Sequence, residues 1–348
     1  MNSDTDATHW DIAELWDDYR PTPLIALPAL ARHTGVAQVL VKCEGQRPLG
    51  NFKALGGMYA GLRALARATG ASSLRELETR KRATGTYRLL CASDGNHGLA
   101  VAAAAARAGA GASVYLPADV DAGRARRIAR LGALVVRVHG TYDDAVDAAQ
   151  AAALRGDGLL IADTSEDPND PVVRDVMAGY GLLVDELRAQ LHEHGDGRIS
   201  HAFVQAGVGG LAAAVAQGLH DRLAQPAGLV VVEPEAAACV AHALSQGAPS
   251  RIPGDLRTSA EMLSCGLASA PALRVLRDHG AVAIAVDESA LVNAAACLHE
   301  HGGPRTSSSG AAGLAGLLQA TVDDRARSAL GLSAASTILL IATEQPRD

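Results

Sequence analysis

The stretch RLLCASDGNHGLAVAAAAARAGA, residues 88–110, combines a short apolar run, a glycine-containing turn and an alanine-rich segment. Residues 88–91 are mostly apolar and are expected to form a strand, while residues 99–108 have the composition of a helix. Gly95 and Gly98 allow the backbone of the turn to curl around a ligand. The stretch therefore predicts one β-α unit with a candidate binding turn.

Short apolar runs alternate with alanine- and leucine-rich segments along the rest of the chain. The runs lie at residues 39–41, 113–116, 134–137, 201–204, 230–232 and 337–341, and the helical segments at residues 122–131, 143–154 and 211–223. Strands that are apolar throughout indicate parallel strands buried on both faces, so this alternation predicts open, mostly parallel α/β sheets. Two clusters of such units, at residues 88–163 and 201–342, predict two lobes with ligands beyond the carboxyl ends of the strands. Residues 72–87 are polar and are expected to form a surface excursion.

The composition indicates an ordinary globular chain without a nucleic-acid partner. The 348 residues are 48% hydrophobic and 20% charged, with a formal net charge of -7. Binding to a phosphate backbone requires clustered basic residues. Arginines gather locally at residues 124–130, but at the spacing of a solvated helix face. We therefore expect a small-molecule ligand rather than a nucleic acid.

The cysteines and the hydropathy pattern predict a cytoplasmic protein. The five cysteines are scattered and include no CxxC pair, which indicates neither a disulfide framework nor a zinc site. No apolar stretch approaches the roughly 18 to 20 residues that span a bilayer. The acidic N-terminal segment lacks the features of a secretory signal. We expect a soluble chain with no membrane partner and no bound metal.

A second candidate turn, RPLGNFKALGG at residues 47–57, presents Lys53 at the start of a predicted helix. The positive end of the helix dipole and partial desolvation both lower a lysine pKa, and a neutral amine can form an imine. Lys53 is therefore a candidate catalytic residue, although a lone lysine in such a turn is also typical of a protein surface.

Three turns offer groups suited to an anionic ligand. In the first, the Asn96 amide can donate to an oxyanion, although the turn also fits an ordinary β-α connection. Residues 205–211, QAGVGGL, form a glycine loop before a helix, where exposed amides bind phosphate. This loop also matches G-x-G-x-x-A, and with Glu233 after the next strand it fits a dinucleotide-binding unit as well. Residues 306–313, TSSSGAAG, supply hydroxyl groups at the start of a helix, which also fits an N-cap.

In this order and spacing, Lys53, Asn96, the glycine loop and Ser309 resemble the fold-type II, or tryptophan-synthase-β-like, enzymes that use pyridoxal 5'-phosphate (PLP). The resemblance covers most of the chain. It implies a two-lobed α/β fold with a small domain at residues 53–164 and a large PLP-binding domain at residues 1–52 and 165–348. It further implies that Lys53 carries PLP as a Schiff base and that Asn96 contacts the phenolic oxygen. The resemblance assigns the phosphate to Gly207, Val208, Gly209 and Gly210, and the pyridine nitrogen to Ser309.

Within this family the chain is most similar to diaminopropionate ammonia-lyase. The likeness lies in SDGNHG at residues 93–98, ADTS at residues 162–165, VMAGY at residues 176–180 and QAGVG at residues 205–209. It implies that Asp94 and Asp163 lie near the substrate, as bases or as partners of a second ammonium group, because two carboxylates suit a dicationic substrate. Asp94 also fits a turn or helix cap, and Asp163 a turn at the end of a strand.

The resemblance thus implies a PLP-dependent ammonia-lyase, expected as a homodimer, that eliminates ammonia from 2,3-diaminopropionate or a related β-substituted amino acid. The product is a 2-oxo acid such as pyruvate. The neutral hydroxyl of Ser309 does not hold the ring nitrogen protonated, which favours elimination over transamination. A serine or threonine dehydratase, or a synthase that replaces the β-substituent, stays open as an alternative. A dehydrogenase that binds NAD is more distant, since it leaves Lys53, Asn96 and Ser309 without a role; its binding residues are Gly207, Gly209, Ala212 and Glu233.

Overall fold

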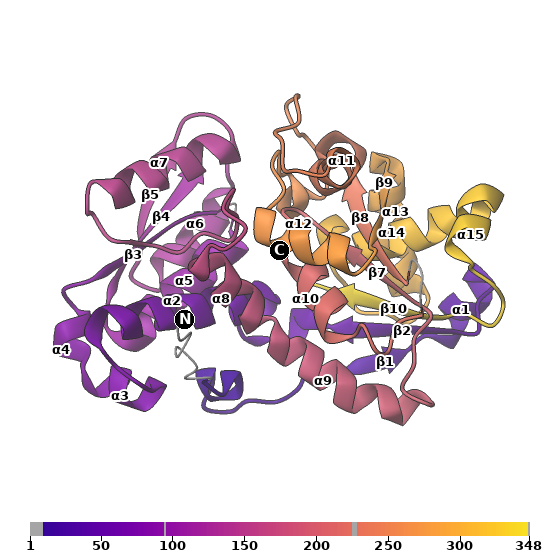
Figure 1. Cartoon of the computed structure of the whole chain (residues 1–348), viewed down its shortest axis with the longest axis horizontal. Coiled ribbons are helices and arrows are strands. Elements are labelled where there is room, and N and C mark those ends of the chain that lie inside the picture. Colours follow the sequence, from indigo (N-terminus) through magenta and orange to yellow (C-terminus); the bar gives the residue numbers. More distant parts are fainter. Residues whose placement is uncertain (1–9, 94, 225–227, 347–348) are drawn as a thin grey trace, which may run out of the picture. The chain divides into compact units, whose positions relative to one another are not determined.

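The computed structural model describes residues 10–93, 95–224 and 228–346, and the chain divides into two compact units. Unit 1 comprises residues 1–20 and 55–162, and unit 2 comprises residues 21–54 and 163–348. Each unit contains its own open sheet with helices packed on it, as the alternation of apolar runs and helical segments predicts (Figure 1). Within the described residues, no helix has both the length and the apolar character needed to cross a membrane.

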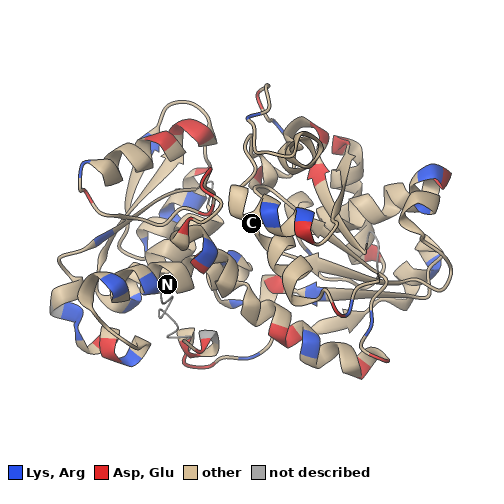
Figure 2. Ribbon diagram, viewed as in Figure 1, with Lys and Arg blue, Asp and Glu red and all other residues tan. Residues whose placement is uncertain are grey.

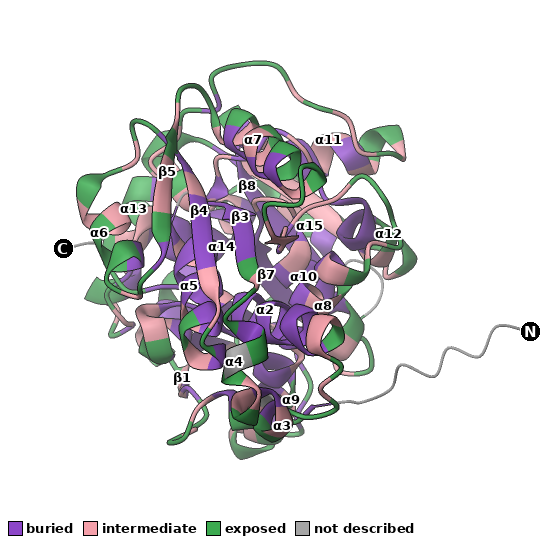
Figure 3. Cartoon of the chain, turned by 90° about the vertical axis from the view of Figure 1, so that its left-hand side faces the viewer, coloured by how far each residue is buried: buried purple, intermediate pink, exposed green. Residues whose placement is uncertain are grey.

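Unit 1 is built on a parallel sheet with the strand order β5-β4-β3-β6. The strands are β3 (Arg88–Ala92), β4 (Gly111–Pro117), β5 (Leu134–Val138) and β6 (Leu159–Leu160). Its helices are η1 (Ile12–Leu15), α3 (Leu74–Thr79), α4 (Lys81–Thr84), α5 (Asn96–Ala108), α6 (Ala122–Ala129) and α7 (Tyr142–Leu154), and α2 (Lys53–Thr69) begins in unit 2 and continues here. Because α5 and α7 pack on β3 and β4, these strands are mostly buried, whereas the edge strand β5 is only partly buried (Figure 3).

Unit 2 contains a six-stranded sheet with the order β1-β2-β10-β7-β8-β9, in which only β1 is antiparallel to its neighbour. The strands are β1 (Leu24–Ala26), β2 (Gln38–Cys43), β7 (His201–Gln205), β8 (Leu229–Pro234), β9 (Val282–Val286) and β10 (Thr337–Ala342). Its α-helices are α1 (Pro28–Thr34), α8 (Pro171–Gly179), α9 (Gly181–Leu191), α10 (Gly210–Gly218), α11 (Cys239–Gln246), α12 (Ala270–Asp278), α13 (Glu288–Glu300), α14 (Ser308–Val322) and α15 (Asp324–Leu330). Its 3-10 helices are η2 (Glu44–Gln46), η3 (Pro48–Gly50), η4 (His192–His194), η5 (Glu235–Ala237) and η6 (Glu261–Leu263).

Helix α14 lies across this sheet and is held close to it by two glycines. A Cβ atom at Gly313 would lie 2.5 Å from the Phe203 carbonyl oxygen, and one at Gly316 would lie 2.5 Å from Val232 Cγ2. Both distances are too short for real atoms, so only glycine allows α14 to approach β7 and β8 this closely. Leucines and alanines of α14 then join the apolar core shared with α1, α13 and the sheet. This packing fixes the first turn of α14, which contains Ser309.

The structure confirms the predicted strands and corrects several boundaries. Each of the seven runs predicted as strands lies in a strand, and the strands β1, β6 and β9 were not predicted. The helix predicted at residues 211–223 ends at Gly218, where a Cβ atom would lie 2.3 Å from Val184 Cγ1. The polar stretch at residues 72–87, predicted as a surface excursion, is mostly exposed or partly exposed; it forms α3 and α4, and α3 buries Leu74 and Leu77. The arginine-rich face of α6 is largely solvated, as predicted.

Charged residues lie mostly on helices and loops, and the strands are almost free of them (Figure 2). Lys42 of β2 is one of the few charged residues in a strand, and it belongs to a buried network in unit 2 that joins the end of β2 to α9. Lys42 Nζ lies 2.6 Å from Glu186 Oε2, and Arg47 donates to Glu44 Oε1 and Glu186 Oε1 at 2.6 Å each. Burial opposes the charged carboxylate, but Arg47 and Lys42 outweigh it and hold the pKa of Glu186 below its ordinary value. The two cations and two carboxylates therefore compensate one another in a buried environment.

Replacing Glu186 by Gln should destabilise the protein by about 3–5 kcal/mol, because it leaves a buried cation uncompensated. Urea unfolding at pH 7 measures the loss. Glu193→Ala, which changes an exposed carboxylate on η4, is the control and should stay within about 0.5 kcal/mol of the unmutated protein. The pKa of Glu186 is lower in the folded protein than in the unfolded chain. Its contribution to the free energy of unfolding is therefore present above the unfolded pKa and is lost as the pH falls through the folded pKa. The difference in free energy of unfolding between the Glu186→Gln variant and the unmutated protein should therefore narrow on acidification. A loss of stability below about 1 kcal/mol at pH 7 contradicts the role of the network.

Candidate active site

Lys53 is presented by a turn whose backbone is held at both ends. The turn contains Leu49 in the left-handed conformation (φ 68°), and the Asn51 side chain donates to the Leu49 carbonyl at 2.9 Å. Asn51 forms a β-bridge with Glu344, and the Phe52 N–H donates to the Thr343 carbonyl at 3.0 Å. Lys53 then begins α2. The position of its side chain is thus set by the segment that follows β10, as well as by its own helix.

The Lys53 ammonium forms an ion pair with Asp163. Their Nζ and Oδ2 atoms lie 2.8 Å apart, and the side chains are 23% and 6% exposed. Burial disfavours the ammonium form, but the charge of Asp163 and its hydrogen bond to the amine outweigh burial and raise the pKa of Lys53. The prediction of a lowered pKa is therefore wrong, because the sequence does not reveal that a carboxylate from a distant segment lies beside the amine.

The glycine loop connects β7 to α10 and has the geometry of an anion cradle. Gly209 has a positive φ of 98° and directly precedes α10, so the loop amides lie at the positive end of the helix. A Cβ atom at Gly207 would lie 3.0 Å from Cys265 Sγ, which leaves no room for a side chain there. The ring of Tyr180 lies next to Gly210, 3.6 Å from the place of its missing Cβ atom. The same ring lies 5.1 Å from that of Phe52, the residue before Lys53, so the loop and the lysine turn share Tyr180 as a neighbour.

Ser309 lies in the first turn of α14 and is almost fully buried. The cap of this helix is Ser307, whose hydroxyl accepts from the Gly310 N–H at 3.0 Å, so Ser309 is not used as the cap. Ser309 Oγ accepts from the Met262 N–H at 3.1 Å. Met262 also borders Gly207, since its carbonyl oxygen lies 3.4 Å from the place of the missing Cβ atom. Among the described residues, no acceptor is found for the Ser309 proton, which can therefore be donated to a ligand.

Gln205 fixes the main chain around Ser309. Its Nε2 atom donates to the carbonyl oxygens of Ser309, Gly310 and Ile341 at 3.2, 2.9 and 2.9 Å. One side chain at the end of β7 thereby ties the start of α14 to β10. In the sequence Gln205 is visible only as the first residue of the glycine loop, and nothing there predicts this role.

The turn after β3 belongs to unit 1 and is described separately. Ser93 Oγ accepts from the N–H groups of Gly95 and Gly98 at 2.9 and 2.8 Å, which bends the chain into α5. Asn96 is the first residue of α5 and is partly exposed. Asp94 lies outside the described residues. The turn follows the carboxyl end of a parallel strand, where ligands are expected in an open sheet.

Glu233 has a structural role that conflicts with the dinucleotide-binding alternative. It is fully buried, and its Oε1 and Oε2 atoms accept from the N–H groups of Val240 and Ala241 at 2.7 Å each. Both oxygens therefore cap α11. Burial raises the pKa of Glu233 to about 8 despite these bonds. A carboxylate enclosed in this way is not available to a ribose hydroxyl group.

Unit 2 thus combines an amine with a buried carboxylate, an anion cradle and a hydroxyl donor. Lys53 pairs with Asp163, Gly207 and Ser309 share Met262 as a neighbour, and Tyr180 lies next to both Phe52 and Gly210. Tyr180, Cys265 and Met262 were not predicted as site residues, although Tyr180 ends the VMAGY segment that carries part of the family resemblance. Tyr180 packs its ring 5.1 Å from that of Phe52 and lies beside Lys53.

Comparisons with known proteins identify relatives of the whole chain. The chain is 32% identical to diaminopropionate ammonia-lyase of Escherichia coli K12 over 343 residues, which cover 95% of this chain and 85% of the relative. The crystal structure of the E. coli enzyme in complex with D-serine superposes with a TM-score of 0.84 at 29% identity, covering 99% of this chain and 92% of the other. A probable D-serine dehydratase of Burkholderia pseudomallei is 28% identical over 80% of this chain and 68% of its own length.

The family model described as pyridoxal-phosphate dependent enzyme matches residues 15–344. This match confirms the open α/β fold of type II and the PLP cofactor predicted from the four turns. The match also removes the NAD-binding alternative. Of the residues assigned to NAD, Gly207 and Gly209 belong to the glycine loop, and Glu233 caps α11. The chain belongs to the family of pyridoxal-phosphate-dependent enzymes.

Proposed function

We propose that this chain is an ammonia-lyase acting on 2,3-diaminopropionate or a related β-substituted amino acid and giving a 2-oxo acid such as pyruvate. For diaminopropionate, one water is consumed, and pyruvate and two molecules of ammonia are released. The observation that carries the proposal is the buried carboxylate of Asp163, 2.8 Å from Lys53 Nζ. The similarity to diaminopropionate ammonia-lyase supports the substrate class.

The residues of unit 2 fit PLP. In the cradle at residues 207–210, Val208 alone has a side chain, and the cradle lies at the N-terminus of α10. Both features suit the phosphate group of PLP. Ser309 retains a proton to donate to the pyridine nitrogen. When bound, PLP withdraws electrons from the α-carbon of the amino acid and so makes its proton acidic. Asn96 of unit 1 is the proposed donor to the phenolic oxygen of PLP. The division into a PLP-binding domain at residues 1–52 and 165–348 and a small domain at residues 53–164 stays a prediction.

Lys53 is the lysine best placed to carry the cofactor. The chain has three lysines. Lys42 is fully buried in the ion network with Glu186, and Lys81 is exposed on α4. Lys53 follows Phe52, whose ring lies 5.1 Å from that of Tyr180, and Tyr180 borders Gly210 of the glycine loop. Asp163 Oδ2 is positioned to accept the proton that the Lys53 amine must lose before it reacts with a carbonyl group.

The acid–base work is proposed for Asp163, Asp94 and Lys53. A carboxylate in a largely buried position is a suitable general base for the α-proton. Asp163 is 6% exposed, and its ion pair with Lys53 directs Oδ2 toward the amine. The assignment of Asp94 rests on the resemblance of the SDGNHG segment alone. The two carboxylates act on the substrate either as bases or as partners of its second ammonium group.

A homodimer in the cytoplasm is the proposed form of the protein. The five cysteines are free thiols, which fits a reducing compartment. Sedimentation analysis of the purified enzyme tests the dimer. A serine dehydratase is the second candidate function, favoured by the similarity to the probable D-serine dehydratase.

Borohydride reduction of the purified yellow enzyme should attach the pyridoxyl group to Lys53. Peptide mapping by mass spectrometry identifies the modified lysine, and Lys42 and Lys81 serve as internal controls in the same digest. Lys53→Ala should remove the stable adduct. Modification of either control lysine, or a purified protein that takes up no PLP, contradicts the assignment.

Ser309→Ala should keep PLP bound but slow turnover, since it removes the donor to the ring nitrogen. Ser309→Asp should increase side transamination, because a carboxylate holds that nitrogen protonated. The partition between 2-oxo acid formation and conversion of PLP to its amino form is measured for each variant. Ser307→Ala is the matched control, because it alters the cap of α14 and leaves Ser309 in place. An unchanged partition in the Asp variant shows that Ser309 is not the pyridine partner.

Asp94→Asn and Asp163→Asn should each affect D- and L-2,3-diaminopropionate unequally if the two carboxylates act as bases. Loss of a general base lowers the rate by about two to four orders of magnitude. Asp94→Asn should mainly impair the D-substrate, and Asp163→Asn the same enantiomer or binding in general. If the carboxylates only bind a second ammonium group, KM should rise for both enantiomers with kcat nearly unchanged. No turnover of either enantiomer by the unmutated enzyme, together with activity on serine or threonine, rules out the diaminopropionate assignment.

A further inference from the structure

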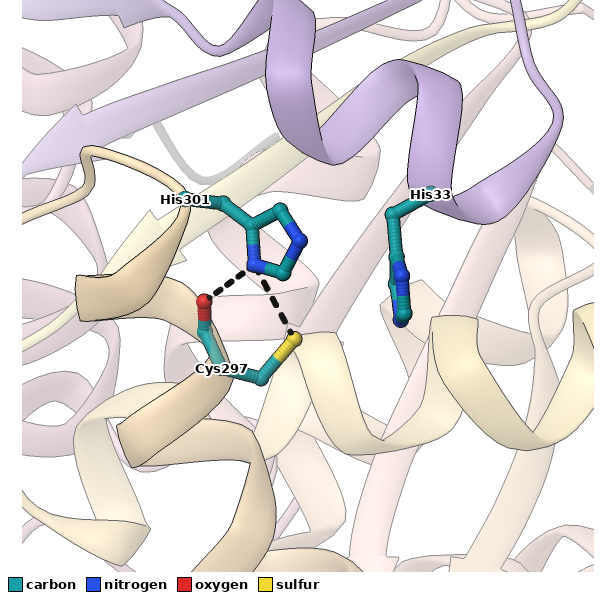
Figure 4. Close-up of side chains that lie close together, drawn as sticks. All are labelled: His33, Cys297 and His301. Carbon is teal, nitrogen blue, oxygen red and sulfur yellow. Dashed lines mark hydrogen bonds between the residues drawn. The ribbon is translucent and has the colours of Figure 1, made fainter.

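A cluster of two imidazoles and one thiol lies in unit 2, built from two helices that are far apart in the sequence. His33 comes from the last turn of α1, Cys297 from the last turn of α13, and His301 is the residue that ends α13. One ligand atom from each of the three residues lies within 4.8 Å of the other two (Figure 4). Cys297 and His301 are four residues apart and so lie on the same face of the helix.

We propose that His33, Cys297 and His301 bind one zinc ion. Zn²⁺ prefers imidazole nitrogen and thiolate sulfur in a tetrahedral arrangement, whereas Mg²⁺ and Ca²⁺ prefer oxygen ligands. Three protein ligands and one water complete such a site. The Cys297 thiol releases its proton to solvent as the sulfur–zinc bond forms, so the bound sulfur is a thiolate.

The hydrogen bonds of His301 prepare it for this role. Its Nδ1 atom lies 2.8 Å from the Cys297 carbonyl oxygen and donates to it, as the dashed line in Figure 4 indicates. The Nε2 atom then keeps a lone pair for a metal. Metal-binding histidines almost always donate their second ring nitrogen to a carbonyl or carboxylate group, which fixes the ring and its tautomer. The Cys297 sulfur lies 3.6 Å from the same ring.

The helices hold the three side chains near the required separation. Leu30 and Ala31 of α1 and Leu291, Ala294 and Leu298 of α13 belong to the same apolar core. The rings of His33 and His301 have centroids 4.7 Å apart. Zinc bond lengths of about 2.0–2.3 Å place two tetrahedral ligands about 3.3–3.6 Å apart. A rotation of the exposed His33 side chain and small shifts of the Cys297 and His301 side chains bring the three ligand atoms from within 4.8 Å of one another to these shorter distances.

Zinc bound here joins α1 to α13 and therefore stabilises unit 2. An ion that binds only the folded chain raises its stability in proportion to the logarithm of the ion concentration above Kd. The site can be followed without measuring activity. Cys297 is partly exposed, whereas Cys43, Cys91, Cys239 and Cys265 are buried, so alkylation of the folded protein reports on Cys297.

The test uses PLP-loaded enzyme that has been treated with a chelator and then dialysed against Zn²⁺, with Mg²⁺ as the control ion. One zinc per chain should be retained, the melting temperature should rise, and zinc should slow iodoacetamide modification of Cys297 at least tenfold. Co²⁺ in place of zinc should give the intense visible bands of a tetrahedral thiolate site. Mg²⁺ should cause none of these changes.

His33→Ala, Cys297→Ser and His301→Ala should each weaken zinc binding at least tenfold. His33 is exposed, so its replacement tests the site without disturbing the fold. His299→Ala is the matched control, because this histidine lies on the same helix but bonds to Gly303 and Arg305 instead. Retention of zinc by the His33 and Cys297 variants, or equal loss in the His299 variant, overturns the proposal. So does the absence of zinc uptake at micromolar concentration by the unmutated enzyme.

Discussion

The hydrogen bonds from the buried Arg47 guanidinium to Glu44 and Glu186 support the turn that presents Lys53. They tie the residues after β2 to α9 inside unit 2, where the charges are shielded from bulk solvent. The other end of the turn is fixed by Thr343 and Glu344 after β10. Lys53 therefore starts α2 from a backbone that is fixed on both sides. Because this backbone is fixed, the Lys53 amine is held beside Asp163 without a rearrangement of the turn. Such preorganisation is what a catalytic group requires.

The strands that are buried on both faces could be predicted from the sequence, because short uninterrupted apolar runs between helical segments are typical of parallel strands in open sheets. The strands that escaped prediction include two without this signal: β1 has three residues at an antiparallel edge, and β6 has two. The end of α10 was placed too late for a different reason. The residues after Gly218 continue a helical pattern, but the contact of Gly218 with Val184 of α9 lies outside any local pattern. Tertiary contacts of this kind decide where elements end.

The candidate site was predictable where a turn carries its own signature and not where the site depends on packing. The glycine loop and the lysine turn are visible as spacing, and the family match confirms the cofactor that they predict. Tyr180, Cys265 and Met262 come from segments without a recognisable turn, and the structure brings them beside Lys53, Gly207 and Ser309. The proposed zinc ligands show the same limit. Cys297 and His301 have a ligand-like spacing in sequence, but His33 joins them only through the packing of α1 on the shared core.

The electrostatics of Asp163 bear on the substrate. Its carboxylate is 6% exposed and is compensated by the Lys53 ammonium. Any reaction that removes the positive charge of Lys53 leaves this carboxylate without its partner, and an uncompensated buried charge costs several kcal/mol. Another cation must then take its place or the carboxylate must accept a proton. An amino acid with a second amino group keeps an ammonium after its α-amino group has reacted, whereas serine has none to offer. A carboxyl group that takes up the Lys53 proton needs no such partner, whereas one that stays ionised at this step is compensated by the second ammonium group of a diamino acid, the substrate class proposed above.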